Sequence, residues 1–176
     1  KNLYQKYPDD LEVIFLLADA IMSYGAWAYW DHQGKPLEGI QEAIDVLNHS
    51  MTLDTLHPGN NHLYIHLFES SLQAEKALPQ ANRLESLMPK AGHVVHMPAH
   101  IYLRLGRYDA AIASNQRSIE TDEYFLEIWS DKPFTKLGSY GLSAEVHRAH
   151  ALDFIRFAST AQGNYEQSIN ASRLAA

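Results

Sequence analysis

Apolar residues recur every three or four positions along nearly the whole chain, and no stretch longer than a few residues shows the period of two that strands require. This pattern predicts an all-α protein. Proline, glycine and acidic start signals divide it into eight expected helices, and the short turns between them favour antiparallel pairs. The expected helices cover residues 11–25, 37–53, 62–72, 78–88, 92–105, 108–121, 144–161 and 165–174.

Three segments interrupt this regular pattern. Residues 25–36 form a loop rich in aromatic side chains, and residues 57–61 contain Pro58 and Gly59, which indicate a strong break before the third helix. Residues 122–143 are irregular but too aromatic for a free linker, so we expect them to fold back on the helices, with a lid as one form of that packing.

A proline falls inside the fifth expected helix. Pro98 lacks a backbone N–H, so the helix either kinks there or begins there. A kinked helix keeps the side chains before and after Pro98 on one face, whereas a helix that begins at Pro98 places His93 and His96 on a preceding turn. We favour the kinked helix.

The middle of the chain repeats itself at an offset of 34 residues. The repeat aligns His62 with His96, His66 with His100, Phe68 with Tyr102 and Ala77 with Ala111. Thirty-four residues is the period of the tetratricopeptide repeat, in which small residues let two helices approach and aromatic residues fill the space beside them.

The segment 92–123 resembles a tetratricopeptide repeat in detail. It carries a small residue and an aromatic residue in the first helix, a glycine turn, and an aromatic and a small residue in the second helix: Ala99, Tyr102, Gly106, Tyr108 and Ala111. The resemblance implies a TPR-like α-solenoid of about four antiparallel helix pairs. We expect one domain over residues 1–176, with approximate repeats at 8–56, 58–91, 92–125 and 146–176.

A narrower resemblance covers most of the chain. Residues 29–31 (YWD), 57–66 (HPGNNHLYIH) and 92–102 (GHVVHMPAHIY) are similar to motifs of a group of bacterial tetratricopeptide proteins. This resemblance implies fold and motif but no particular reaction. In the last repeat that group usually carries a second histidine three residues after the first, whereas here His150 is followed by Asp153, which is still a metal-ligating residue type.

Histidine is the compositional outlier. Ten of the 176 residues are histidines, whereas average usage gives about four. In tetratricopeptide stacks the first helix of each repeat lines a concave groove, and the resemblance implies that eight ligand-type residues lie at groove-facing positions of successive repeats. These residues are His62, His66, Glu69, His93, His96, His100, His150 and Asp153.

The spacing of these residues also indicates metal chemistry. His62 and His66 are four residues apart, as are His96 and His100, and two imidazoles one helical turn apart can chelate one cation. We expect these four residues to bind a divalent transition metal or a small ligand. The other four serve as further ligands or as residues that hold the ligands. Imidazole and carboxylate suit zinc, iron, nickel or copper(II) and do not discriminate among them.

Other interpretations apply to the remaining aromatic and histidine residues. Trp27, Tyr29 and Trp30 stack on a ligand at the groove or fill the core under an inserted loop. His57 precedes Pro58 and reads as a turn residue, although it is close enough to His62 in sequence to be a reserve groove residue. Three histidines are out of register with the cluster, and we interpret them as surface residues: His32, His49 and His147.

Charge and composition exclude several classes of function. The net charge of −7 disfavours nucleic acid as a partner. No apolar run reaches the roughly 18 residues of a membrane span and no signal peptide opens the sequence, so we expect no membrane partner and a cytoplasmic location. The absence of cysteine excludes disulfides and thiolate ligands. The sequence begins at Lys1 without a methionine, so we expect a fragment of a longer chain.

Two functions from different classes remain. The first is a metal-binding helical repeat protein, with a metalloenzyme of unassigned reaction as one form of it. The second is an interaction scaffold that binds a peptide or protein partner in its groove, the commonest use of this fold. The sequence contains no glycine-rich phosphate loop and no nucleophile elbow, and it does not decide the oligomeric state.

Overall fold

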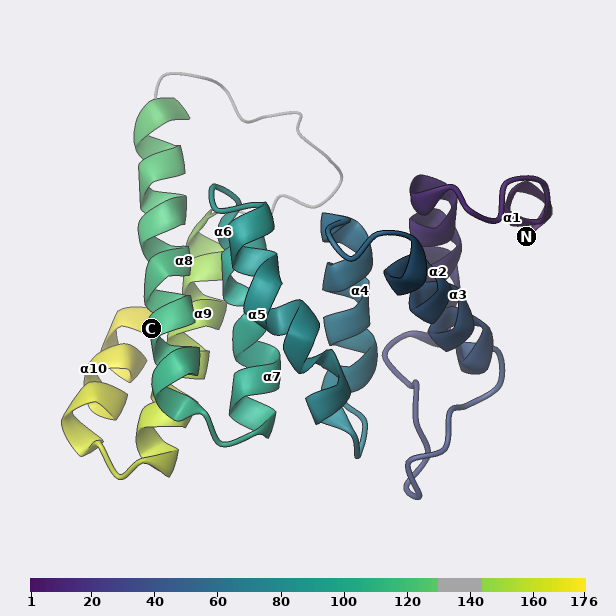
Figure 1. The fold of residues 1–176 in the computed structure, drawn as a ribbon. Helices are drawn as coiled ribbons and strands as arrows, with labels where there is room; N and C mark the ends of the chain where they lie inside the picture. The colour runs from purple at the N-terminus through teal and green to yellow at the C-terminus, as the bar shows by residue number, and fades with distance from the viewer. Residues whose placement is uncertain (130–143) are drawn as a thin grey trace. The chain divides into compact units, whose positions relative to one another are not determined.

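The structure is a computed structural model that describes residues 1–129 and 144–176. Within these residues the regular structure is helical, apart from one isolated β-bridge between Trp30 and Pro36, so the all-α prediction is confirmed. The elements are α1 (Asn2–Lys6), α2 (Leu11–Gly25), α3 (Ile40–Leu53), α4 (Pro58–Glu69), the 3-10 turn η1 (Ala74–Ala77), α5 (Leu78–Leu87), α6 (Gly92–His96), α7 (Pro98–Arg104), α8 (Tyr108–Trp129), α9 (Ala144–Ala161) and α10 (Tyr165–Ala175) (Figure 1).

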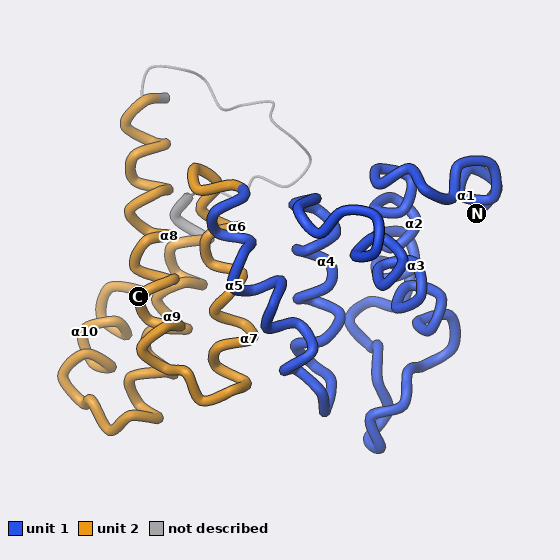
Figure 2. Tube along the Cα trace, viewed as in Figure 1, with its two compact units in different colours: residues 1–87 blue, residues 88–176 orange. Residues whose placement is uncertain are grey.

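The chain divides into two compact units. Unit 1 comprises Lys1–Leu87 and unit 2 comprises Met88–Ala176 (Figure 2). The division falls near the boundary that the sequence predicts between the repeats 58–91 and 92–125. The expectation of a single domain over residues 1–176 stays a prediction.

Helix α2 opens the regular part of unit 1 as the sequence predicts. The Asp10 carboxylate accepts hydrogen bonds from the backbone N–H groups of Glu12 at 3.0 Å and Val13 at 3.1 Å, which caps the first turn. The buried face of α2 packs against α3 and α4. The short helix α1, which the sequence pattern does not predict, contacts α2 and buries none of its own residues.

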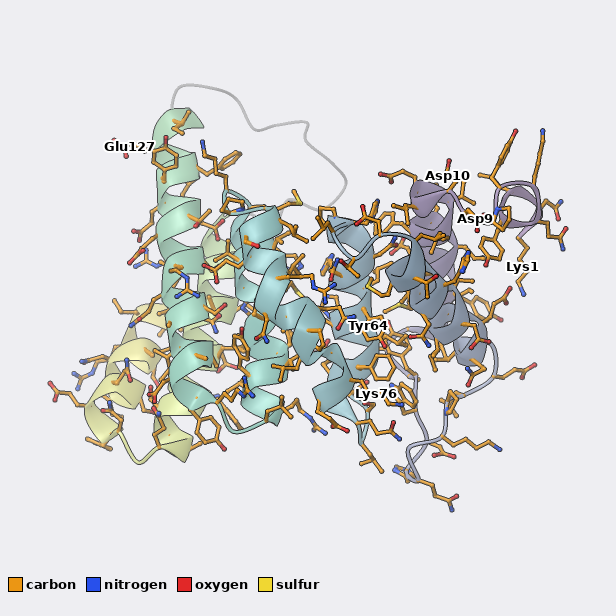
Figure 3. The ribbon with its side chains drawn as sticks, in the orientation of Figure 1. Lys1, Asp9, Asp10, Tyr64, Lys76 and Glu127 are labelled. Carbon is orange, nitrogen blue, oxygen red and sulfur yellow. The ribbon has the colours of Figure 1, made fainter. Side chains whose placement is uncertain are left out.

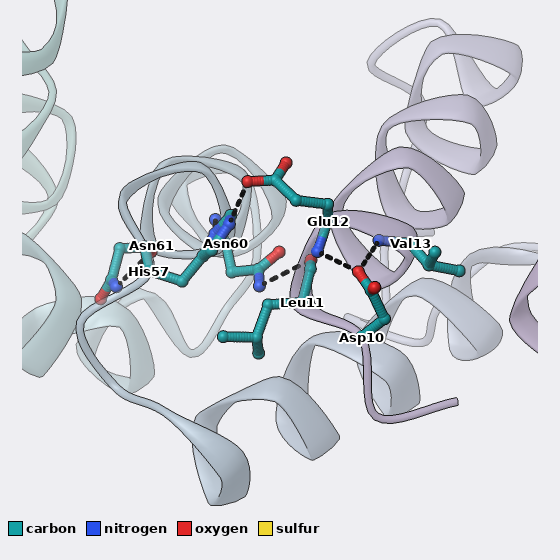
Figure 4. Close-up of polar contacts among 7 residues, drawn as sticks. All are labelled: Asp10, Leu11, Glu12, Val13, His57, Asn60 and Asn61. Atoms are coloured by element: carbon teal, nitrogen blue, oxygen red, sulfur yellow. Dashed lines mark hydrogen bonds and ion pairs between the residues drawn. The ribbon is translucent and has the colours of Figure 1, made fainter. Parts of the chain in front are cut away.

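Helix α4 begins at Pro58, four residues before its predicted start. The prediction was wrong because residues 57–61 were interpreted as a break, whereas proline is well suited to the first position of a helix, where its missing N–H costs nothing. His57 caps the helix, since its Nδ1 accepts a hydrogen bond from the Asn60 backbone N–H at 3.1 Å (Figure 4). Asn61 donates from its side chain to the carbonyls of Thr55 and His57, both at 2.8 Å.

The core of unit 1 lies among α2, α3, α4 and α5 and consists of aliphatic and aromatic side chains. Tyr64, marked in Figure 3, is buried on α4, stacks on Phe68 and donates its hydroxyl to Asn48 Oδ1 at 3.0 Å. The most deeply buried apolar residues are Ile14, Ala18, Ile40, Ala43, Leu47, Ile65, Leu67, Ala77, Ala81 and Leu84.

Unit 2 contains two helix turns of the same geometry. Gly106, between α7 and α8, and Gly163, between α9 and α10, both have positive φ (69° and 74°). After the first glycine, Arg107 N–H donates to the Tyr102 carbonyl at 2.8 Å, and after the second, Asn164 N–H donates to the Ser159 carbonyl at 2.8 Å. Both turns are therefore Schellman motifs, which end the first helix and reverse the chain into the second (Figure 1).

Pro98 separates α6 from α7 without ending the helical path. Met97, between the two helices, has φ −50° and ψ −38°, and its N–H donates to the His93 carbonyl at 3.2 Å. The His100 N–H donates to the Met97 carbonyl at 3.2 Å, which is a tighter i→i−3 bond. A separate helix therefore begins at Pro98, as the second alternative predicts, but His93 and His96 lie on the preceding helix α6 rather than on a turn, and the rings of His96 and His100 still meet.

Helix α8 is longer than the sequence pattern predicts. It continues through Asp122 to Trp129, so the irregular stretch does not begin at 122. Residues 122–129 contain neither proline nor glycine, and an acidic, aromatic sequence without a breaker continues a helix at little cost. Glu127 projects from this last part of α8 (Figure 3). The remainder of the predicted lid, residues 130–143, lies outside the described residues.

The apolar core of unit 2 lies among α8, α9 and α10. Ile112, Leu152, Ile155, Ala158 and Ala171 form it, with partly buried side chains from α7 and α8 around them. In the described ranges, no helix combines the length and the apolar character that crossing a membrane requires.

Candidate metal centre

Three histidines of unit 2 bring their ring nitrogens together. His96 at the end of α6, His100 on α7 and His150 on α9 each offer one nitrogen, and these nitrogens lie within 4.8 Å of one another. His96 is fully buried, His100 is half-buried and His150 is exposed. This histidine triad has the donor type and the number of protein ligands of a mononuclear metal site.

His96 is held in one tautomer by a side chain of α8. Its Nδ1 lies 2.6 Å from Asn115 Oδ1, and the amide of Asn115 is itself oriented because its Nδ2 donates to the Ala111 carbonyl at 2.8 Å. The Asn115 oxygen accepts, so the proton of the neutral His96 ring lies on Nδ1. The Nε2 lone pair of His96 is therefore available to the triad.

Burial keeps His96 neutral. Desolvation of the ring is the largest cause that lowers the pKa of His96 far below the usual histidine value of 6.5, and the neighbouring His100, His150 and His147 lower it further. The hydrogen bond with Asn115 acts in the opposite direction but does not outweigh burial. A neutral imidazole is the form that binds a metal ion.

The Nε2 atoms of His96 and His100 face each other at 2.9 Å. Because His96 Nε2 carries no proton, His100 donates its Nε2 proton to it in the absence of an ion. Two nitrogens bound to one zinc ion at 2.0–2.1 Å each stand roughly 3.3 Å apart. The pair is therefore close to the separation that a shared ion needs, and a bound cation would take the place of the shared proton.

An aromatic side chain forms one wall of the triad. Phe154, one helical turn after His150 on α9, contacts all three rings edge to face, with centroid distances of 4.7 Å to His96, 4.8 Å to His100 and 4.9 Å to His150. These contacts restrict the rotation of the imidazoles and exclude water from one side of the site.

Buried serines hold α6 against α8. Ser114 Oγ donates to the Val95 carbonyl at 2.7 Å and Ser118 Oγ donates to the Gly92 carbonyl at 2.9 Å. Gly92 has no space for a Cβ, because the Asp122 carboxylate occupies that position. The position of His96 relative to Asn115 is thus set by polar contacts along the whole of α6.

Three residues beside the triad were missed by the sequence prediction. His147 was interpreted as a surface residue, but its side chain is only 11% exposed and its Nδ1 lies 2.5 Å from the Asp122 carboxylate. Its ring centroid lies 5.5 Å from that of His96 and 6.4 Å from that of His150. The i, i+3 spacing of His147 and His150 was the available signal. Asn115 and Asp122, seven residues apart on one face of α8, had no signal of their own.

Asp153 does not join the triad. Its carboxylate is 60% exposed and accepts from the Arg156 guanidinium at 2.7 and 2.8 Å. In the structure Phe154 is the side chain of α9 that contacts the imidazole of His150, and the expectation that Asp153 is a ligand or a residue that holds the ligands stays a prediction. His93 is exposed on α6, with its ring centroid 6.2 Å from that of His96 and 5.5 Å from that of His147, so it lies at the edge of the site.

Unit 1 carries the corresponding residues His62, His66 and Glu69 on α4. The rings of His62 and His66 are 4.8 Å apart, as the i, i+4 spacing predicts. The Nδ1 of His66 lies 2.7 Å from a Glu69 carboxylate oxygen, and both side chains are largely buried. Within this unit Glu69 therefore orients His66. The Glu69 carboxylate contacts the Nδ1 of His66, as the Asn115 amide oxygen contacts the Nδ1 of His96.

The aromatic loop contributes mostly to the core of unit 1. Tyr29 is buried and its pKa is raised, chiefly by burial. Trp30 donates its indole N–H to the Leu67 carbonyl at 2.7 Å and packs on Phe68. Trp27 is different, because it is 62% exposed, has a positive φ of 69° and places its ring edge to face on His66 at 4.8 Å.

His57 is a turn residue. Its Nδ1 caps α4 and its Nε2 lies 3.2 Å from the Glu12 carboxylate, so both ring nitrogens have partners at the start of the helix (Figure 4). His49 pairs with Asp9 at 2.7 Å and His32 is exposed, as the sequence predicts for surface residues.

Comparison with known proteins adds no identification. No protein-family model, no curated protein and no solved structure matches the chain. The evidence for function is therefore the geometry of the site.

Proposed function

We propose that the chain is a tetratricopeptide-type helical repeat protein whose histidine-rich face binds a divalent transition metal at His96, His100 and His150. The observation that carries the proposal is the orientation of His96. Its Nδ1 proton is committed to Asn115, and its buried Nε2 lone pair faces a second imidazole at 2.9 Å. A ligand histidine that donates its other N–H to an oxygen acceptor is typical of metal sites in proteins.

The helical repeat part of the proposal rests on the two glycine turns and the 34-residue offset. The matching Schellman motifs at Gly106 and Gly163 end the first helix of each pair in the same way. The offset aligns His62 and His66 with His96 and His100, and α4 and α6–α7 begin the corresponding segments. Equivalent histidine pairs on equivalent helices are what a duplicated helical repeat produces.

Three neutral imidazoles with no thiolate suit zinc, copper(II), nickel or iron(II). Three protein ligands leave a coordination position for water or substrate, which is the arrangement of catalytic rather than structural zinc sites. A reaction at this site would require that no protein side chain fills this position. The geometry assigns no substrate.

The test uses the chain without a polyhistidine tag. After removal of metal with a chelator, the protein is titrated with zinc and the bound metal is measured by elemental analysis after gel filtration. We expect about one ion per chain, lost in His96→Ala and His100→Ala, and retained in His49→Gln, a matched change at a histidine in a surface ion pair. Sub-stoichiometric metal after reconstitution, or variants that bind as the parent does, would contradict the proposal and favour a peptide-binding scaffold.

A further inference from the structure

His147 is an oriented imidazole with an unused nitrogen. Its Nδ1 is engaged by the Asp122 carboxylate at 2.5 Å, while its Nε2 is buried and has no hydrogen-bond partner among the described residues. A buried polar atom without a hydrogen-bond partner costs folding free energy, and such atoms in folded proteins often have a functional role or an unseen ligand. An acidic residue on one nitrogen and a bare lone pair on the other is the arrangement of the carboxylate–histidine–metal triads.

The ring of His147 lies at the distance that a shared ion requires. In a tetrahedral site with metal–nitrogen bonds of 2.0–2.1 Å, ring centroids stand roughly 5 Å apart. The centroid of His147 is 5.5 Å from that of His96 and 6.4 Å from that of His150. Within the triad, the separations are 4.8 Å for His96 and His100, 4.7 Å for His96 and His150, and 6.0 Å for His100 and His150. The His147 ring therefore lies close to the triad, but His147 does not belong to the group of nitrogens within 4.8 Å of one another, so its ring has to turn for Nε2 to reach a shared ion.

We propose that His147 is the fourth nitrogen donor of the metal centre, with Asp122 as the residue that positions it. This inference rests on the proposed function, since it extends the same site. The ring of His147 turns towards the ion while its Nδ1–H bond to Asp122 is kept, and the open position of the three-histidine site is filled by protein. The centre then has four neutral imidazoles.

The negative charge of Asp122 favours this arrangement electrostatically. Four neutral imidazoles leave the full double charge of the ion in a partly buried site, which is costly without a nearby anion. The Asp122 side chain is 17% exposed, and its carboxylate contacts His147 directly, so it supplies the negative charge next to the ligand shell. Asp153 does not serve this purpose, because Arg156 already neutralises it.

Cobalt(II) is the probe that tests the proposal, since its visible spectrum reports coordination number. The tag-free full chain, His147→Gln and Asp122→Asn are titrated with cobalt(II) at neutral pH. In the parent we expect the intense visible bands of tetrahedral cobalt. In His147→Gln, where water takes the fourth position, we expect visible bands that differ in energy and intensity from those of the parent and a dissociation constant roughly 10- to 100-fold larger. In Asp122→Asn, which leaves the imidazole in place, we expect tetrahedral bands with weaker binding.

Each contrary outcome has a distinct meaning. An unchanged spectrum and an unchanged affinity in His147→Gln would overturn the role of His147 and leave the three-histidine site standing. No cobalt binding in the parent chain would instead refute the proposed function itself. Arg148→Gln serves as the matched control. Arg148 follows His147 on α9, but its side chain is exposed and forms a long ion pair of 3.9 Å with Glu123. The Arg148→Gln variant should therefore bind cobalt as the parent does. Circular dichroism of the metal-free variants shows whether each one is folded, and Asp122→Asn still tests the proposal if His147→Gln is not.

Discussion

The two units carry the same histidine pair in different surroundings. His62 and His66 on α4 and His96 and His100 on α6–α7 are both spaced i, i+4, and both pairs have ring centroids 4.8 Å apart. In unit 2, however, His96 is fully buried, a neutral amide fixes its tautomer, and α9 adds a third imidazole. In unit 1, His66 pairs with the Glu69 carboxylate, and the exposed Trp27 covers its ring.

This difference shows what a sequence spacing does and does not determine. The i, i+4 spacing places two rings on one turn of a helix in either unit. The third donor, the residue that orients the ring and the degree of burial come from neighbouring helices. A metal centre therefore depends on the packing around the pair more than on the pair itself.

The strongest test of the comparison replaces the equivalent residues His96 and His62 by alanine. His96→Ala should abolish metal binding and lower the free energy of unfolding by about 2–4 kcal/mol, because it leaves a cavity and an unsatisfied Asn115 oxygen. His62→Ala, at a half-buried position, should cost about 1 kcal/mol or less and leave the metal bound to unit 2. Urea unfolding and zinc titration measure both. Equal effects in the two units would contradict the comparison.

The residues that orient the rings give the next largest effect. Asn115→Ala removes the acceptor for His96 Nδ1–H and should weaken zinc binding by roughly 10- to 100-fold. Glu69→Gln removes the charge that orients His66 in unit 1 and should leave zinc binding by the unit 2 triad unchanged. Calorimetric titration separates the two. A weaker effect for Asn115→Ala than for Glu69→Gln would show that unit 1 contains the stronger site.

The pH dependence of stability sharpens the contrast between the buried and half-buried pairs. Since the pKa of His96 is lowered in the folded chain, the unfolded chain binds an extra proton as the pH falls below about 6.5. The free energy of unfolding of the metal-free protein should then fall by up to about 1.4 kcal/mol per pH unit, and its value should be highest above that pH. Urea unfolding between pH 7 and pH 5 measures the slope. His96→Gln should have a shallower slope, and an identical slope would contradict a neutral, buried His96.

The two Schellman turns provide the smallest expected effects. Gly106→Ala and Gly163→Ala each place a Cβ at a positive φ, which should lower the free energy of unfolding by about 1 kcal/mol. No atom lies near either Cβ position, so backbone strain is the whole effect. Thermal unfolding measures both, and similar losses are expected at the two turns. A large difference between them would argue against their equivalence as repeat turns.

Much of the helical framework was predictable because its signals are local. The limits of α2 follow from Asp10 and Gly25, and the end of α9 follows from Gly163. Helix α10 ends one residue beyond its predicted limit. The start of α4 was missed because Pro58 and Gly59 read equally as a break or as a first turn, and only the His57 cap distinguishes the two. The extent of α8 was missed because the acidic, aromatic sequence from Asp122 onwards was interpreted as irregular, whereas it contains no residue that ends a helix before Trp129.

The candidate site was only partly predictable. The spacing of His96 and His100 predicted two residues of the site, and the expected repeat position of His150 predicted the third. His147 and Asp122 are 25 residues apart in sequence and meet only because α8 and α9 pack together. Asp153 pairs with Arg156, whereas the next residue, Phe154, contacts the imidazoles, and the expected repeat position alone does not distinguish these two neighbours.

The serine contacts between α6 and α8 have a consequence for how an ion arrives. Ser114 and Ser118 tie down the backbone of α6 before any ion is present, and Phe154 holds the rings from the other side. The conformational entropy of the ligands is thus lost when the polypeptide folds, and little remains to be lost on association. Such a preorganised triad would favour an ion whose size and preferred geometry fit the three imidazoles.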